Sequence, residues 1–267
     1  DPETNEEEYD RLMKIFHEYD IKAFFYVGGN DSIDTINKLS KYAKKKNIDI
    51  KFIGIPKTID NDLMYTDHTP GFGSAAKFIG TTAIETYLDS SVYTNNGIFI
   101  LETMGRDTGW LAASACLARI DNKPVADFIY LPEVVFDEEK FLKDVRKRFE
   151  ENNKVYIVVS EGIRNKDGKF ISEIESSTQD KFGHAQLGGV CNYLKNIIIE
   201  NGITNRVKAL ELGILQRCSM HCASDMDLKE AYDVGKCAYQ YAVDGETGKM
   251  VAINRTSNFL YDVSYTL

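Results

Sequence analysis

The chain has 267 residues and a formal net charge of −9, because 41 Asp and Glu outnumber 32 Lys and Arg. A hydrophobic fraction of 43% is enough for a packed core and excludes global disorder. No apolar run reaches the roughly 18–20 residues of a membrane helix. The acidic balance argues against a general nucleic-acid binder, which needs a basic face. Any anionic ligand must then be held by local cations and backbone N–H groups.

The length predicts one large domain or two small ones. The chain begins with Asp1 rather than Met and has no secretory signal, which we interpret as the middle of a longer protein.

Its five cysteines, an odd number at wide spacing, favour reduced thiols in a cytoplasmic protein over a disulfide framework. Cys218, His221 and Cys222 have metal-ligand chemistry but lack a second ligand pair, so we favour no zinc site there.

Strands and helices alternate along the chain, which predicts an α/β fold with parallel sheets. Apolar runs predict strands at residues 21–27, 51–55, 97–101, 127–131, 154–160, 207–215 and 250–253. Helical spacing of apolar residues predicts helices at residues 33–46, 110–118, 137–152, 185–199 and 228–243. The Asp167–Gly168 pair predicts a tight hairpin turn in the polar stretch 165–182.

Glycines, acids and cations follow five of these strands, at the sheet edge where α/β proteins collect ligands. The five segments are GGNDS (28–32), PKTIDND (56–62), ETMGRD (102–107), EG (161–162) and QR (216–217). Gly28 and Gly29 before a helix let a phosphate approach the backbone, although such a turn is as often purely structural. Asn30 and Asp31 offer oxygens to a hard cation such as Mg²⁺, and Asp31 or Ser32 equally fits a helix N-cap.

Two carboxylates lie two residues apart in the second of these segments. Asp60 and Asp62 can divide proton transfer and metal binding between them, or can simply form a turn. Glu161 suits a pair of sugar hydroxyls, or a salt bridge to an arginine. Three cations at strand ends can bind phosphate oxygens: Lys57, Arg106 and Arg217. Together these groups predict phosphoryl transfer, which depends on positioning and charge neutralisation.

The motifs GGNDS, PKTIDND, MGRD, SEG, LGxxQR and GETGKMV, in this order, resemble the phosphofructokinase family from about residue 24 to residue 253. The resemblance implies two Rossmann-like α/β/α subdomains with parallel sheets and an active site in the cleft between them. It implies a phosphoryl-donor subdomain at 1–71 and 217–253, and a fructose 6-phosphate subdomain at 72–216 and 254–267. It also implies that the family's leading strand and Gly-rich phosphate loop are missing here, so this chain need not be active by itself.

The resemblance also implies roles for individual residues. Asp60 is implied to be the base that deprotonates the 1-hydroxyl of fructose 6-phosphate, and Lys57, Thr58 and Arg106 complete the catalytic set. Asp62 is implied to bind substrate and, with Asn30, to hold Mg²⁺; Asn30 replaces an Asp of many members. The sugar phosphate is implied to contact Met104, Gly105, Glu161, Arg217 and His221. The donor phosphates are implied to contact Gly28, Gly29, Asn30, Asp31 and Ser32. His221 lies where the family has Gly-Gly-x-Pro, and it either touches substrate or caps the following helix.

Two positions indicate the phosphoryl donor. ATP-dependent members typically have GGDGS and PGTIDND, whereas this chain has Asp31 and Lys57 at the variable glycines. Asp31 fills space that the α-phosphate of ATP would need, and Lys57 offers pyrophosphate a cation. The resemblance therefore implies the pyrophosphate-dependent branch: a cytoplasmic, Mg²⁺-dependent, glycolytic phosphotransferase and homo-oligomer. The alternatives are an ATP-dependent enzyme and a non-catalytic regulatory subunit. The regulatory subunit is disfavoured because the whole set is present: Lys57, Asp60, Asp62 and Arg106.

Overall fold

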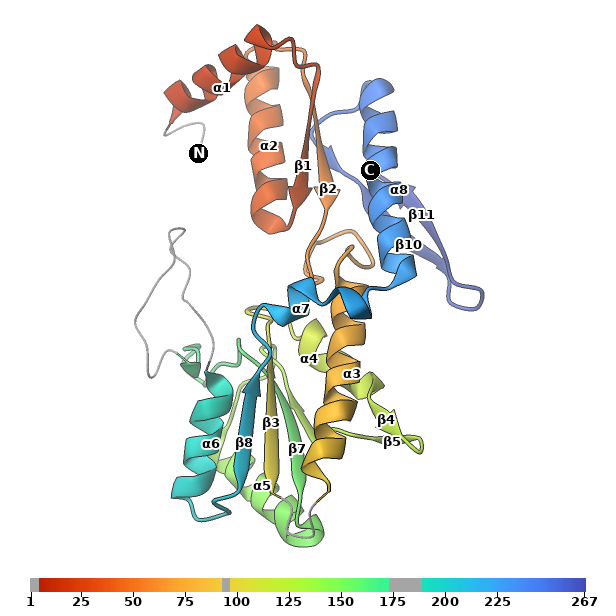
Figure 1. Cartoon of the computed structure of the whole chain (residues 1–267). Helices are drawn as coiled ribbons and strands as arrows, with labels where there is room; N and C mark the ends of the chain where they lie inside the picture. The colour runs from red at the N-terminus through yellow and green to blue at the C-terminus, as the bar shows by residue number, and fades with distance from the viewer. Residues whose placement is uncertain (1–4, 93–96, 173–188) are drawn as a thin grey trace. The chain divides into compact units, whose positions relative to one another are not determined.

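The computed structural model describes residues 5–92, 97–172 and 189–267 (Figure 1). The chain forms two compact units: the first combines Asp1–Gly73 with Ser224–Leu267, and the second is Ser74–Ala223. The predicted subdomains differ from this division in three segments. Residues 72 and 73 belong to the first unit rather than the second. Residues 254–267 belong to the first unit, because a C-terminal hairpin packs its Val263 and Tyr265 on that core. Residues 217–223 belong to the second unit, where Lys77 donates a hydrogen bond of 3.3 Å to the Ala223 carbonyl.

The first unit contains a parallel sheet of order β1-β2-β9. Its strands are β1 (Ala23–Gly28), β2 (Lys51–Pro56) and β9 (Lys249–Met250), and its helices are α1 (Glu6–Glu18), α2 (Asn30–Lys45) and α8 (Asp225–Val243). The chain then continues into an antiparallel hairpin of β10 (Ala252–Ser257) and β11 (Asp262–Thr266). β1 and β2 are thus joined by α2 as a parallel pair, as the sequence predicts.

Both faces of this first sheet are covered. Phe52, fully buried, packs with Phe16 of α1 and Leu39 of α2. Its neighbour Ile53, on the opposite face, packs with Val234 of α8. Successive side chains of a strand point to opposite faces, so the alternation in β2 produces the α/β/α layering seen in Figure 1.

The second unit contains a parallel sheet of order β6-β7-β3-β8. Its strands are β3 (Ile98–Thr103), β6 (Phe128–Tyr130), β7 (Val155–Ser160) and β8 (Val207–Glu211), with a small antiparallel pair β4 (Arg119–Ile120) and β5 (Lys123–Pro124). Its helices are α3 (Phe72–Ser90, which starts at the unit boundary), α4 (Trp110–Ser114), α5 (Glu138–Asn152), α6 (Val190–Glu200) and α7 (Leu215–Cys218). β3 and β7 are buried at every position, which is why they read as continuous apolar runs.

Most predicted elements are confirmed, with shifted ends. The strand expected at 207–215 stops at Glu211, because Gly213 adopts a left-handed φ of 50° and α7 follows. The strand expected at 250–253 is divided at Val251 into β9 and β10. The hairpin turn at Asp167–Gly168 is present, with a φ of 76° at Gly168. Residues 173–182 of the polar stretch, and the expected helical start at 185–188, lie outside the described residues.

Sequence reasoning missed α1, α3, α7, the β4–β5 pair, β11 and all but the start of β10. α3 has 19 residues, but small and apolar residues dominate it and its exposed polar stripe of Lys77, Thr81, Glu85 and Asp89 is narrow, so its amphipathic pattern is weak. β10 and β11 contain Asn, Arg, Ser and Asp, which lower their resemblance to buried strands. Within the described ranges, no helix is both long and apolar enough to cross a membrane.

Candidate active site

The Gly28–Gly29 turn joins β1 to α2 and lies beside the end of β2. Gly28 pairs with Pro56 in the parallel register, and its carbonyl accepts a hydrogen bond of 3.1 Å from the Lys57 N–H. A Cβ on Gly28 would lie 2.1 Å from the Ser32 Oγ, so this position has no room for a side chain. The turn is therefore packed closely against both the first turn of α2 and the loop after β2.

Gly29 is the N-cap of α2, and no side chain caps this helix end. The alternative in which Asp31 or Ser32 serves as the N-cap is therefore wrong. Asn30 and Asp31 occupy the first helical turn, and both are exposed. Free N–H groups at a helix start favour an anion, so the predicted donor-phosphate residues 28–32 meet at one helix N-terminus.

The turn after β2 contains the two predicted carboxylates. The buried Thr58 donates a hydrogen bond of 3.1 Å from its Oγ1 to the Asp60 Oδ2, and accepts one of 3.1 Å from the Asp60 N–H. Asn61 is left-handed with a φ of 55°, and its Oδ1 accepts a hydrogen bond of 3.0 Å from the Thr69 N–H. These contacts leave the half-buried Asp60 carboxylate oriented by Thr58.

The two predicted metal ligands come from different loops and meet. The Asn30 Nδ2 lies 2.6 Å from the Asp62 Oδ2. A half-turn of the Asn30 amide would place its oxygen beside that carboxylate, and such oxygens suit Mg²⁺. In the described part of the chain, no three His, Cys, Asp or Glu side chains gather as a metal cage. The donor set therefore fits an ion that takes its remaining ligands from water and phosphate, as Mg²⁺ does.

In the second unit, Met104 and Gly105 form a tight loop at the carboxyl end of β3. The Met104 N–H donates a hydrogen bond of 3.1 Å to the Gln216 Oε1, and the Gly105 N–H donates one of 3.2 Å to the Glu161 Oε1. Gly105 has a φ of 128°, which side chains rarely tolerate. Glu161 and Gln216, each following another strand, thus fix the backbone of this loop.

The Glu161–Gly162 turn packs directly on the same loop. A Cβ on Gly162 would lie 2.0 Å from the Arg106 carbonyl oxygen and 2.4 Å from that of Gly105. The Ser160 Oγ donates a hydrogen bond of 2.5 Å to the Gly105 carbonyl. Met104, Gly105, Arg106 and Glu161, predicted as one set, are therefore neighbours.

The predicted cations of the second unit differ in exposure. The Arg106 Nε is buried and has no hydrogen-bond partner among the residues that the structure describes, so the guanidinium keeps donor capacity for a ligand. Arg217 is exposed near the end of α7. Asp107, which follows Arg106 in the sequence, forms an ion pair with Arg164.

His221 lies in the short 3₁₀ turn Met220–Cys222, where its exposed ring packs edge-on against Phe78, with ring centroids 6.3 Å apart. It does not cap α8, because Ser224 is the N-cap and its side chain accepts from the Asp227 N–H. The capping alternative is wrong. A role of His221 toward substrate stays a prediction.

Sequence reasoning missed three residues that shape these loops: Thr69, Gly162 and Gln216. The last two belong to the quoted segments EG and QR, but a role was given only to their charged members. Thr69 carries no signal in the sequence, because its hydrogen bonds to residues 58 and 61 depend on the path of the loop.

A sequence profile of the phosphofructokinase family matches residues 1–240. The chain belongs to the phosphofructokinase family. The resemblance stated from the motifs is therefore confirmed, and the two parallel α/β sheets are the phosphofructokinase fold.

Relatives and solved structures agree with this assignment. The chain is 42% identical over 261 residues to pyrophosphate–fructose 6-phosphate 1-phosphotransferase of Methylococcus capsulatus, covering 97% of this chain and 61% of the relative. It is similar to the crystal structure of the pyrophosphate-dependent phosphofructokinase of Marinobacter aquaeolei, with a TM-score of 0.82 and 37% identity over 97% of this chain and 61% of that one. A second such structure, from Nitrosospira multiformis, gives a TM-score of 0.83 at 34% identity, covering 98% of this chain and 62% of that one. This phosphofructokinase-family chain thus spans about three-fifths of the length of these relatives.

Proposed function

We propose that the protein to which this chain belongs transfers a phosphoryl group from pyrophosphate to the 1-hydroxyl of fructose 6-phosphate. The relatives that share about two-fifths of its residues carry that name. The observation that carries the proposal is the pair of loops in the first unit, where Lys57 adjoins the Gly28–Gly29 turn and Asp62 meets Asn30. A cytoplasmic location, a glycolytic role and a homo-oligomeric state belong to the same proposal.

The first unit supplies the chemistry in this proposal. Asp60, oriented by Thr58, accepts the proton of the 1-hydroxyl. The freed oxygen attacks the transferred phosphorus atom, and the bond from phosphorus to the departing phosphate breaks. Asn30 and Asp62 hold Mg²⁺, which when bound neutralises charge on the phosphate oxygens. Lys57 is exposed and adds a mobile cation for the donor.

The second unit supplies sugar-phosphate binding in this proposal. Arg106 has an uncommitted Nε donor, and Arg217 can pair with phosphate. Glu161, whose Oε1 accepts a hydrogen bond from the Gly105 N–H, is a carboxylate that accepts a sugar hydroxyl. Met104 and His221 contribute contact surface. This assignment gives proton transfer and donor binding to one unit and acceptor binding to the other.

Donor choice follows from two side chains in this proposal. Asp31, in the first turn of α2, occupies the space that an adenosine α-phosphate would need and repels its charge. Lys57 takes the place of a glycine and binds the outer oxygens of pyrophosphate. The alternative, an ATP-dependent enzyme, requires that ATP bind despite both residues.

The test is a donor assay on the full-length protein with fructose 6-phosphate and Mg²⁺. We expect pyrophosphate to support turnover far better than ATP, and Lys57→Met to raise KM for pyrophosphate about 10-fold or more, as loss of a charged hydrogen bond does. Lys51→Met, at the opposite end of β2, is the matched control and should leave KM unchanged. Turnover with ATP and none with pyrophosphate would overturn the proposal.

A further inference from the structure

The catalytic turn belongs to a longer loop, residues 57–71, that joins β2 to α3. We define residues 66–71 as its return segment. The Thr69 Oγ1 donates a hydrogen bond of 2.8 Å to the Thr58 carbonyl, and the Thr58 N–H donates one of 3.2 Å to the Pro70 carbonyl. Thr69 also holds Asn61 through its N–H. The return segment is therefore the support against which the Asp60 turn is built.

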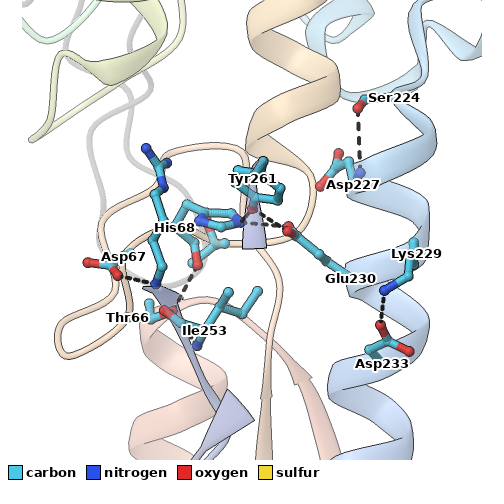
Figure 2. A network of polar contacts seen from close by, with 12 residues as sticks. Thr66, Asp67, His68, Ser224, Asp227, Lys229, Glu230, Asp233, Ile253 and Tyr261 are labelled. Atoms are coloured by element: carbon cyan, nitrogen blue, oxygen red, sulfur yellow. Dashed lines mark hydrogen bonds and ion pairs between the residues drawn. The ribbon is translucent and has the colours of Figure 1, made fainter. Parts of the chain in front are cut away.

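The C-terminal hairpin holds the start of this return segment. The Asp67 N–H donates a hydrogen bond of 2.8 Å to the Ile253 carbonyl, and the Ile253 N–H donates one of 3.0 Å to the Thr66 Oγ1. The Arg255 N–H donates one of 2.6 Å to the Asp67 Oδ2. The segment thus binds main-chain groups of β10, and Figure 2 shows Thr66, Asp67 and Ile253 at this contact.

Helix α8 holds the rest of the return segment through two carboxylates one turn apart. The Asp227 Oδ1 accepts a hydrogen bond of 2.7 Å from the Gly71 N–H. The Glu230 Oε2 lies 2.5 Å from the His68 Nε2. Tyr261 donates its hydroxyl proton to the other oxygen of Glu230, and this hydroxyl is 3.2 Å from the His68 Nε2 (Figure 2).

Two of the three side chains in this cluster are largely buried, whereas Tyr261 is 37% exposed. The side chains of His68 and Glu230 are 13% and 3% exposed. Burying a hydrogen-bonded pair of polar side chains gains little stability over apolar packing, because the cost of desolvation offsets their attraction. What such a pair does impose is one geometry. His68 is followed by Thr69, so a displacement of His68 moves the residue that holds Thr58 and Asn61.

We propose that His68, Glu230 and Tyr261 are positioning residues for the catalytic turn: they fix the return segment and through it the orientation of Asp60. The inference rests on the proposed function only for the role of Asp60 as base. The three residues come from the loop, from α8 and from the hairpin, so the C-terminal hairpin takes part in the chemistry without touching substrate.

The first test uses two tyrosines of the same hairpin. Tyr261→Phe removes the hydroxyl that binds Glu230, and Tyr265→Phe removes a hydroxyl that binds Asp233, also on α8, at 3.1 Å. Amide hydrogen exchange of peptides covering residues 57–71 in the full-length protein, without substrate, should rise about 10-fold in Tyr261→Phe, as loss of one hydrogen bond allows. It should stay unchanged in Tyr265→Phe. Equal exchange in the two variants would overturn the proposal.

The second test is kinetic. In His68→Gln the amide nitrogen can replace the Nε2 donor, whereas in His68→Asn the shorter side chain cannot reach Glu230. We expect kcat to fall about 10-fold in His68→Asn, because loss of this hydrogen bond loosens the turn that orients Asp60 in the transition state. His68→Gln should retain most of kcat, with KM for both substrates unchanged in each variant. Equal kcat values in the two variants would contradict the proposal. If the wild-type protein shows no turnover with pyrophosphate, the proposed function fails, while the exchange experiment still decides the role of the cluster.

Discussion

Side chains from other segments hold both the loop after β2 in the first unit and the loop after β3 in the second, but the second loop depends in addition on close glycine packing. Side chains from distant segments, such as Asp227 and Glu230 of α8, hold the first loop. The second is held by the Gln216 and Glu161 side chains and also by close glycine packing, with Gly162 against the carbonyls of residues 105 and 106. Backbone packing tolerates almost no change, whereas a side-chain network can be weakened one hydrogen bond at a time. The loop after β2 is the one proposed to carry out proton transfer, and the loop after β3 is the one proposed to bind the sugar phosphate.

The largest expected effect is on kcat, and it comes from a substitution in the loop after β2. Asp60→Asn removes the proposed base, so kcat should fall by roughly 10²–10⁴-fold with little change in KM for fructose 6-phosphate. Glu161→Gln, in the other loop, should mainly raise that KM. Steady-state kinetics on the full-length protein decide the matter. An unchanged kcat in Asp60→Asn would remove this residue as the base.

The next effect tests the glycine packing. Gly162→Ala places a Cβ where carbonyl oxygens lie 2.0 and 2.4 Å away, so the two turns must separate. We expect a loss of about 2–4 kcal/mol of unfolding free energy, as steric overpacking at a buried backbone costs. Gly235→Ala on α8, where a Cβ meets nothing within 4 Å, is the matched control and should be neutral or stabilising. Urea unfolding measures both.

Glu230 in the first unit and Glu102 in the second are both buried, but they make the unfolding free energy depend on pH in opposite directions. Burial works against ionisation of Glu230, but hydrogen bonds from His68 and Tyr261 outweigh it, so its pKa lies below the usual value. A lowered pKa contributes stability above the unfolded pKa of about 4.3, and this stability is lost as pH falls through the folded pKa. Glu102, at the end of β3, has its pKa raised by burial, against an opposing hydrogen bond from the Cys191 N–H. The pH dependence of the Glu102 contribution to stability is therefore opposite to that of Glu230. The Glu102 contribution is fully present below the unfolded pKa and is lost as pH rises through the folded pKa.

The two Gln variants should therefore behave oppositely. Glu230→Gln should lower the unfolding free energy at pH 7 and flatten the loss of stability below about pH 4. Glu102→Gln should leave stability at pH 7 unchanged or raise it, because a buried charge is removed. Urea unfolding from pH 3 to pH 8 is the measurement. A common direction in both variants would show that the two carboxylates are held alike.

The smallest effect concerns the tip of the first loop. Tyr65 is 89% exposed and has a φ of 66°, a conformation that favours glycine. Tyr65→Gly should raise the unfolding free energy by about 1 kcal/mol, because the left-handed strain costs roughly that much. Thermal unfolding reports the gain. A loss instead would indicate that the Tyr65 ring contributes stabilising contacts.

Much of the candidate site could be predicted from the sequence. Buried parallel strands are apolar runs, so their ends are visible, and the side chains that follow them gather at one sheet edge. This located Gly28, Thr58 and Asp60 in the first unit and Met104 and Glu161 in the second. Beyond residue 253, the hairpin of β10 and β11 could not be predicted, because its strands are polar and pair with each other rather than with a buried sheet.

By itself, the sequence determined the α/β class, the family and the loops that contain the candidate residues, since each depends on local pattern and motif. The tertiary structure decided which distant groups hold those loops. His68, Glu230 and Tyr261 are separated by 162 and 31 positions along the chain, and nothing local predicts that they meet. Their meeting requires the chain to leave the first unit at Gly73 and re-enter it at Ser224, which brings α8 and the hairpin onto the loop. Long-range contacts of this kind are fixed by packing of the whole unit rather than by the residues beside them.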